Sequence, residues 1–101
     1  MQKDVTTSWG TFDHGSVQTA LTAVQLTTTS TKCEQGVWVK AAGTNVENVF
    51  VGNSDVTAGT ANGTDGYILD AGENVFVAVN NVTKVYVLGN DINQKVYWLS
   101  V

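Results

Sequence analysis

Residues 49–57, VFVGNSDVT, begin as a strand with apolar side chains on both faces and then break at a polar turn. A strand with one face in water alternates apolar and polar side chains, because successive side chains point to opposite faces. This stretch does not alternate, and neither do residues 75–79 (VFVAV), 85–88 (VYVL) and 96–99 (VYWL). Something beyond a single hydrophobic core must therefore cover the second face of these strands.

The composition favours one all-β domain. The chain has 101 residues, 43% of them hydrophobic and none of them proline. Valine and threonine are frequent, and β-branched side chains lose freedom in a helix but pack well on a pleated sheet. A chain of this length forms one domain, and no segment shows the apolar spacing of an amphipathic helix.

Turn-forming residues divide the chain into short expected strands. These are residues 16–27, 36–42, 46–52, 66–70, 73–79, 83–89 and 94–100. Such spacing is typical of an antiparallel β-sandwich, jelly-roll-like, or of a small barrel. Residues 1–15 show no strand periodicity, so we expect an extended N-terminal arm followed by a single β-sandwich domain over residues 16–101.

Five large side chains are expected to point away from the core. In a two-sheet sandwich the domain itself buries only the inner face of each strand, so alternation directs outward Phe76, Tyr86, Leu88, Tyr97 and Leu99. Together they would form an apolar patch of a kind that soluble monomers avoid. Loops or the arm could cover them, or copies of the chain could pack side by side. We expect a homo-oligomer with these residues at the subunit interface, and favour a trimer, since so short a chain has little length with which to cover itself.

Charge and cysteine content exclude several partners. The net charge is −4, with five lysines and no arginine, so no basic patch can neutralise the phosphates of a nucleic acid or the surface of an anionic membrane. No apolar run is long enough to cross a membrane, and no signal-peptide pattern follows Met1. Cys33 is the single cysteine, which agrees with assembly in a reducing cytoplasm.

No arrangement of residues predicts catalysis. His14 and Cys33 are each unique, and His14 lies in the expected arm, which is a poor place for a preorganised base. No G-x-S-x-G turn is present, and one histidine with one cysteine cannot form a zinc site. We therefore expect no catalytic residue, no cofactor and no metal.

Two other ligand hypotheses are weaker than structural explanations. Asp65 lies within the glycine-rich segment 62–66, with Asp55 before it and Asp70 after it, but their spacing lacks the ligand pattern of an EF-hand. Aspartate and asparagine in such loops commonly bond the local backbone. A sugar-stacking platform would need aromatic side chains on one face, and the sequence favours core or interface positions instead for Trp9, Trp38, Tyr67, Tyr86, Tyr97 and Trp98.

Three segments occur in an informative order. They are residues 36–57 (GVWVKAAGTNVENVFVGNSDVT), 66–89 (GYILDAGENVFVAVNNVTKVYVLG) and 95–101 (KVYWLSV). This order resembles a recurring small β-sandwich domain of tailed-bacteriophage virions, which occurs in capsid decoration (cement) proteins and in other minor virion components. The resemblance covers about two thirds of the chain and departs from the family at residues 71–73, Ala-Gly-Glu, where Pro-Gly-Glu is frequent.

The resemblance implies a non-enzymatic structural protein of the virion, assembled in the host cytoplasm. Its expected partners are other copies of itself and the major capsid protein or another virion protein. The arm lies outside the resemblance, but Trp9 and Phe12 are large apolar groups that we expect to contact a partner. The alternative is a fibre or receptor-binding domain whose aromatic side chains contact cell-surface carbohydrate.

Overall fold

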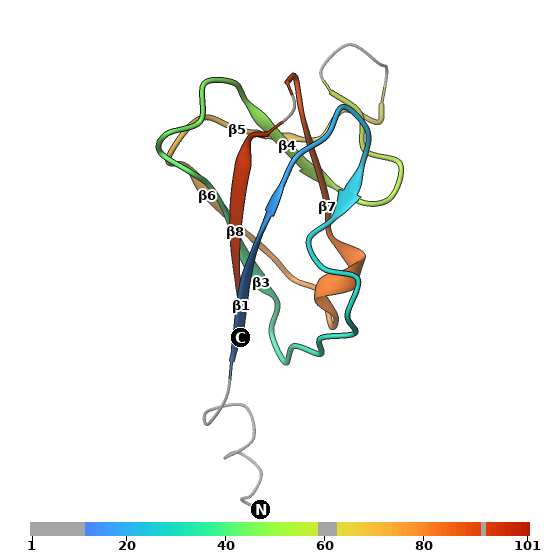
Figure 1. The fold of residues 1–101 in the computed structure, drawn as a ribbon. Helices are drawn as coiled ribbons and strands as arrows, with labels where there is room; N and C mark the ends of the chain where they lie inside the picture. The colour runs from blue at the N-terminus through green and yellow to red at the C-terminus, as the bar shows by residue number, and fades with distance from the viewer. Residues whose placement is uncertain (1–11, 59–62, 92) are drawn as a thin grey trace, which may run out of the picture.

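The computed structural model of the chain describes residues 12–58, 63–91 and 93–101. The elements in these residues are the strands β1 (Asp13–Gln18), β2 (Val24–Gln25), β3 (Val37–Ala41), β4 (Val49–Gly52), β5 (Tyr67–Leu69), β6 (Asn74–Val77), β7 (Tyr86–Gly89) and β8 (Lys95–Ser100), and a short 3₁₀ helix, η1 (Val82–Lys84) (Figure 1). Within this described part, no helix is both long and apolar enough to cross a membrane.

The strands form two antiparallel sheets that face each other. One has the order β1-β8-β3-β6 and the other β2-β7-β4-β5. The pairing is nested, because β1 pairs with β8, β2 with β7, β3 with β6 and β4 with β5, as in one long hairpin rolled up on itself. Eight strands arranged in this way form a jelly roll. The predicted antiparallel β-sandwich is confirmed, whereas the barrel alternative is wrong because the two sheets stay open.

The core lies between the sheets and follows strand alternation. Each sheet turns every second side chain inward, and most of these inward side chains are valines. The first sheet contributes Val37, Val39, Ala41, Val96 and Trp98, and the second contributes Val49, Val51, Leu69 and Val87. Burying one such aliphatic side chain contributes roughly 1.5–3 kcal/mol.

The first strand begins earlier than the sequence predicts. β1 starts at Asp13, inside the expected arm of residues 1–15, and pairs residue by residue with β8 from Asp13↔Ser100 onward. The Asp13 backbone N–H also donates to Ser100 Oγ at 3.1 Å. A Cβ at Gly15 would lie 2.7 Å from the Trp98 ring, so glycine lets the indole pack against β1. Pairing with a strand far away in sequence sets this boundary, and local periodicity cannot reveal it.

The expected strand 16–27 is two strands in different sheets. The chain leaves the first sheet after Gln18 and joins the second as β2. Thr19 fixes this crossing, because its buried hydroxyl accepts the Gln94 backbone N–H and donates to the Asp91 carbonyl, each at 3.2 Å. Uniform β propensity along the segment conceals the change of sheet.

Candidate interaction surface

The stretch 49–57 covers Phe50 and Leu88, in the middle of the outer face of the second sheet, with its own chain. Phe50, Val56 and Leu88 form a second buried cluster there, with exposed fractions of 3%, 6% and 3%. Ile68, in the same row on the edge strand β5, stays 52% exposed. The turn after β4 brings Val56 back over the sheet, and the Val56 backbone N–H donates to the Asn53 carbonyl at 3.0 Å. A Cβ at Gly66 would lie 2.5 Å from Val56 Cγ2, so this close packing requires glycine.

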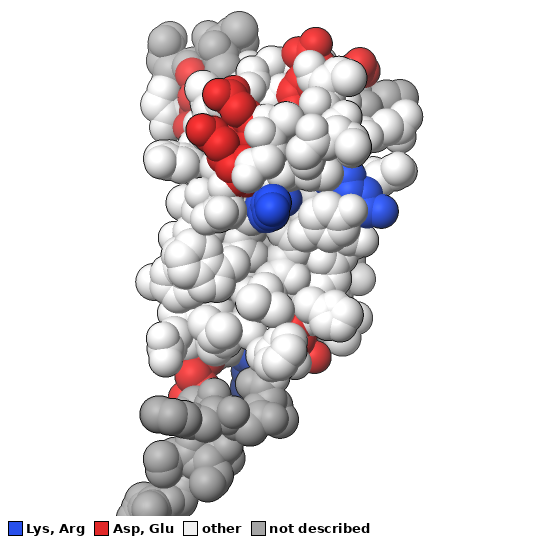
Figure 2. Space-filling model, turned by 90° about the vertical axis from the view of Figure 1, so that its left-hand side faces the viewer, with Lys and Arg blue, Asp and Glu red and all other residues white. Residues whose placement is uncertain are grey.

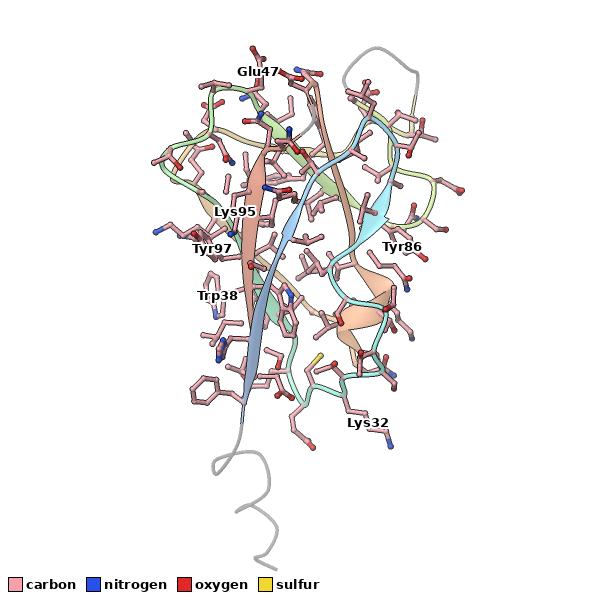
Figure 3. The ribbon with its side chains drawn as sticks, in the orientation of Figure 1. Lys32, Trp38, Glu47, Tyr86, Lys95 and Tyr97 are labelled. Carbon is pink, nitrogen blue, oxygen red and sulfur yellow. The ribbon has the colours of Figure 1, made fainter. Side chains whose placement is uncertain are left out.

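Two of the predicted interface residues therefore lie apart from the other three. Leu88 is covered by its own chain, which corrects its predicted place at a subunit interface. Tyr86 is half-buried and packs against the same cluster. Figure 3 shows Tyr86 on the side of the sandwich opposite Trp38 and Tyr97.

The outer face of the first sheet is not covered by the described chain. Strand register places its outward side chains in two adjacent rows, each running across β1, β8, β3 and β6. We call these two rows the open face; they are His14-Leu99-Trp38-Phe76 and Ser16-Tyr97-Lys40-Asn74. Trp38, Tyr97 and Leu99 are 43%, 47% and 38% exposed. The structure thus brings Phe76, Tyr97 and Leu99 together, as predicted.

The open face is mainly aromatic and aliphatic and is shallowly hollowed, and Lys40 contributes a positive charge to the hollow. A groove of about 440 Å³ lies among Trp38, Lys40, Asn74, Tyr97 and Leu99. The Trp38 and Phe76 rings lie 5.0 Å apart and are tilted by 57°, which is a favourable aromatic geometry. Figure 2 views the side to which Trp38 and Tyr97 project, and shows a broad uncharged surface with basic side chains above it and acidic ones both at the top of the molecule and below this surface.

The sequence left Trp38 undecided between core and interface, and Lys40 was missed in the prediction of the interface. Their signal is the alternation in β3, VWVKA, in which the first, third and fifth side chains are buried and the second and fourth are exposed. Lys95 lies beside the open face with its ammonium 5.7 Å from the centre of the Tyr97 ring. An ammonium group within about 6 Å of a ring centre is attracted to the negative face of the ring.

The predicted arm contacts are only partly within the described residues. Phe12 is 64% exposed and immediately precedes β1. Trp9 and the rest of residues 1–11 lie outside the described part of the chain. Contact of either aromatic residue with a partner remains a prediction.

The structure does not bring His14 and Cys33 together. His14 lies on the open face opposite Leu99, whereas Cys33 packs against the core between the sheets. The Cys33 thiol donates to the Val79 carbonyl at 3.2 Å. A nucleophile and its base must be within hydrogen-bond reach, whereas Cys33 packs against the core and His14 lies on the outward face of the first sheet.

The aspartates are likewise separated. Asp55 and Asp65 line a polar pocket of about 290 Å³, whereas Asp70 follows β5 and accepts a hydrogen bond from the Asn48 side chain. Among residues 12–58, 63–91 and 93–101, no group of three His, Cys, Asp or Glu side chains is placed to hold a metal ion.

Cys33 is expected to react slowly with alkylating reagents. Burial raises the pKa of the Cys33 thiol, because desolvation disfavours the thiolate, and the thiolate is the nucleophile. Alkylation by iodoacetamide at about pH 8 should therefore be slower than that of free cysteine and should increase toward higher pH. His14→Ala should leave the rate unchanged. Alkylation faster than that of free cysteine at neutral pH would contradict this and would indicate an activated thiol.

Comparison with protein-family models, with curated proteins and with solved structures found no match for this chain.

Proposed function

We propose that the chain is a non-enzymatic structural protein of a bacteriophage virion, a capsid decoration (cement) protein that assembles into a homotrimer through its open face. The observation that supports this most directly is the difference between the two sheets. The turn after β4 folds back to bury Phe50 and Leu88 on the second sheet. The first sheet leaves Trp38 and Tyr97 exposed, and exposed clusters of this kind mark interaction sites.

The chemistry of the open face suits a protein partner. Aromatic residues are enriched at the centre of protein interfaces and charged residues are depleted there. The whole chain is only 14% charged, so little desolvation of charge opposes association. The two rows of the open face present their aromatic and aliphatic side chains together, and Lys40 and Asn74 add two polar groups to the lining of the groove.

The sequence resemblance supports the virion and the partner class. It favours the major capsid protein or another virion protein as the surface to which the trimer attaches. Jelly rolls occur both in viral capsid proteins and in lectins, so the fold is compatible with the proposal and with its alternative alike. The order of the three matching segments favours the virion.

Antibody labelling of purified virions tests the location. A gold-labelled antibody against the chain should decorate the heads of phage particles evenly in negative stain. Sedimentation equilibrium of the purified chain at micromolar concentration should give three times the mass of one chain. Particles without label, together with a monomeric mass at every concentration, would overturn the proposal.

A receptor-binding domain is the second candidate, and one observation favours it. The groove on the open face holds two aromatic side chains, Trp38 and Tyr97, beside the Asn74 amide and the Lys40 ammonium. Flat rings next to hydrogen-bonding groups are suited to a sugar ring and its hydroxyls. Label confined to fibre tips, with binding to immobilised bacterial polysaccharide, would favour this candidate over decoration.

A further inference from the structure

A second apolar groove lies on another side of the sandwich, between the edge of β6 and the second sheet. It has a volume of about 300 Å³. Most of its lining is apolar and comes from Val51, Tyr67, Val75, Val77, Val79 and Val85, and Asn53 and Lys84 line it as well. We call it the edge groove. Val75, Val77 and Val79 pack against the core but are only partly buried. Inward-facing valines that stay partly exposed show that the core is incompletely closed along this side.

The strand that borders the edge groove has a free edge. Within the described residues, β6 ends the order of its sheet and pairs only with β3. The Ala41 backbone N–H donates to the Glu73 carbonyl at 2.9 Å. Because hydrogen-bonding direction alternates along an antiparallel strand, Val75 and Val77 then bond toward β3. The backbone groups of Asn74 and Phe76 point to the free edge.

A free strand edge beside an apolar groove favours the addition of an extended peptide. The edge supplies main-chain hydrogen bonds, and the groove accepts alternate side chains of the added strand. We propose that residues 5–9 of a second copy of this chain add to β6 as a strand and place Val5, Thr7 and Trp9 in the edge groove.

The sequence of residues 5–9, VTTSW, suits this place. Valine and threonine favour the extended conformation, and alternation separates Val5, Thr7 and Trp9 from Thr6 and Ser8. No charged residue occurs between Asp4 and Asp13. An uncharged strand enters an apolar groove without the cost of burying a charge.

Chain length indicates that this strand comes from a second copy. β1 and β6 are at opposite edges of their sheet, so a strand added beyond β6 lies four strand spacings from β1, about 19 Å. If Trp9 lay beside β6, the four steps to Asp13 would span about 14 Å at most. The arm of the same chain is too short, whereas an arm from a neighbouring copy is free of this limit.

This interface differs from the open face, and its test has a readout of its own. The Phe76 backbone N–H should exchange with solvent at least about tenfold more slowly in the full chain than in a Val5→Asp, Trp9→Asp variant, because an added strand would hydrogen-bond it. A Thr6→Asp, Ser8→Asp variant carries the same added charge on the other side of the strand and should keep the slow exchange. Equal exchange in all three proteins, or loss of protection in both variants, would overturn the proposal.

A mixing experiment tests the origin of the strand. The Val5→Asp, Trp9→Asp variant, labelled with ¹⁵N, retains β6 and its edge groove but lacks a competent arm. An excess of unlabelled full chain should restore slow exchange of Phe76 in the labelled protein. If the full chain is protected but mixing restores nothing, the strand comes from the same chain and the second copy is excluded. Sedimentation of variants on the open face tests the proposed function separately, so either proposal can fail alone.

Discussion

Replacing Leu88 by alanine is expected to lower the free energy of unfolding by about 3 kcal/mol and to leave the mass of the assembly unchanged. Leu88 is 3% exposed and packs with Phe50 and Val56 under the turn that follows β4. Truncation removes buried methyl groups and leaves a cavity, because the sheet on one side and the turn on the other can collapse only in part. Urea unfolding at a fixed chain concentration measures the loss.

A leucine in another environment provides the matched control. Leu21 is 61% exposed, and Leu21→Ala should change the free energy of unfolding by less than about 0.5 kcal/mol. If Leu88→Ala lowered the free energy of unfolding as little as Leu21→Ala, the turn after β4 would not bury Leu88 on the outer face of the second sheet. A change in assembly mass with normal stability would instead return Leu88 to a subunit interface.

The same turn shows what the sequence can and cannot predict. The non-alternating strand 49–51 correctly indicates that both faces of β4 are buried. The sequence does not say what covers the second face, because burial by Val56 and burial by another copy produce the same apolar pattern. Leu88 and Leu99 both lie in non-alternating strands, yet one is buried and the other is 38% exposed. Only the path of the turn after β4 distinguishes them.

Long-range hydrogen bonds explain other differences between prediction and structure. The gap between the expected strands 36–42 and 46–52 holds a turn, in which the Asn45 backbone N–H donates to the Ala42 carbonyl at 3.1 Å, but the long-range contacts of Asn45 are not predicted. The Asn45 side chain accepts the Lys95 backbone N–H at 2.8 Å and donates to the Lys95 carbonyl at 2.9 Å. These bonds join residues 50 positions apart, as do many in a rolled hairpin. Local propensity contains no information on such long-range partners. Long-range hydrogen bonds also set the start of β1 and the crossing at Thr19.

Strand alternation predicts which side chains of the candidate site point outward, and this part of the site could be predicted from the sequence. Phe76, Tyr97 and Leu99 were assigned to one outward surface, and register places all three on the open face. Whether copies of the chain meet there depends on a partner surface that one sequence does not describe. The trimer and its place in the virion therefore remain predictions.

Replacing Trp38 by alanine is expected to weaken self-association by about 2 kcal/mol for each interface, roughly thirtyfold in its dissociation constant. Trp38 is 43% exposed in the single chain and lies near the middle of the open face, between Leu99 on β8 and Phe76 on β6. Tryptophan at the centre of an interface contributes more than the residues around it. Sedimentation velocity over a range of concentrations measures the shift.

Leucine variants at two exposed positions then separate the open face from general surface effects. Leu99→Ala should weaken association in the same direction as Trp38→Ala but by less, since leucine is seldom a dominant interface residue. Leu21→Ala removes the same atoms as Leu99→Ala, but from an exposed position that lies outside both sheets. It should therefore leave association unchanged. Each variant must melt cooperatively, so that loss of assembly reflects the interface and not the fold.

If Trp38→Ala and Leu99→Ala both assemble as the parent chain does, the open face is not the subunit interface. Its aromatic groove would then be free for a carbohydrate, which is the arrangement that a receptor-binding domain requires.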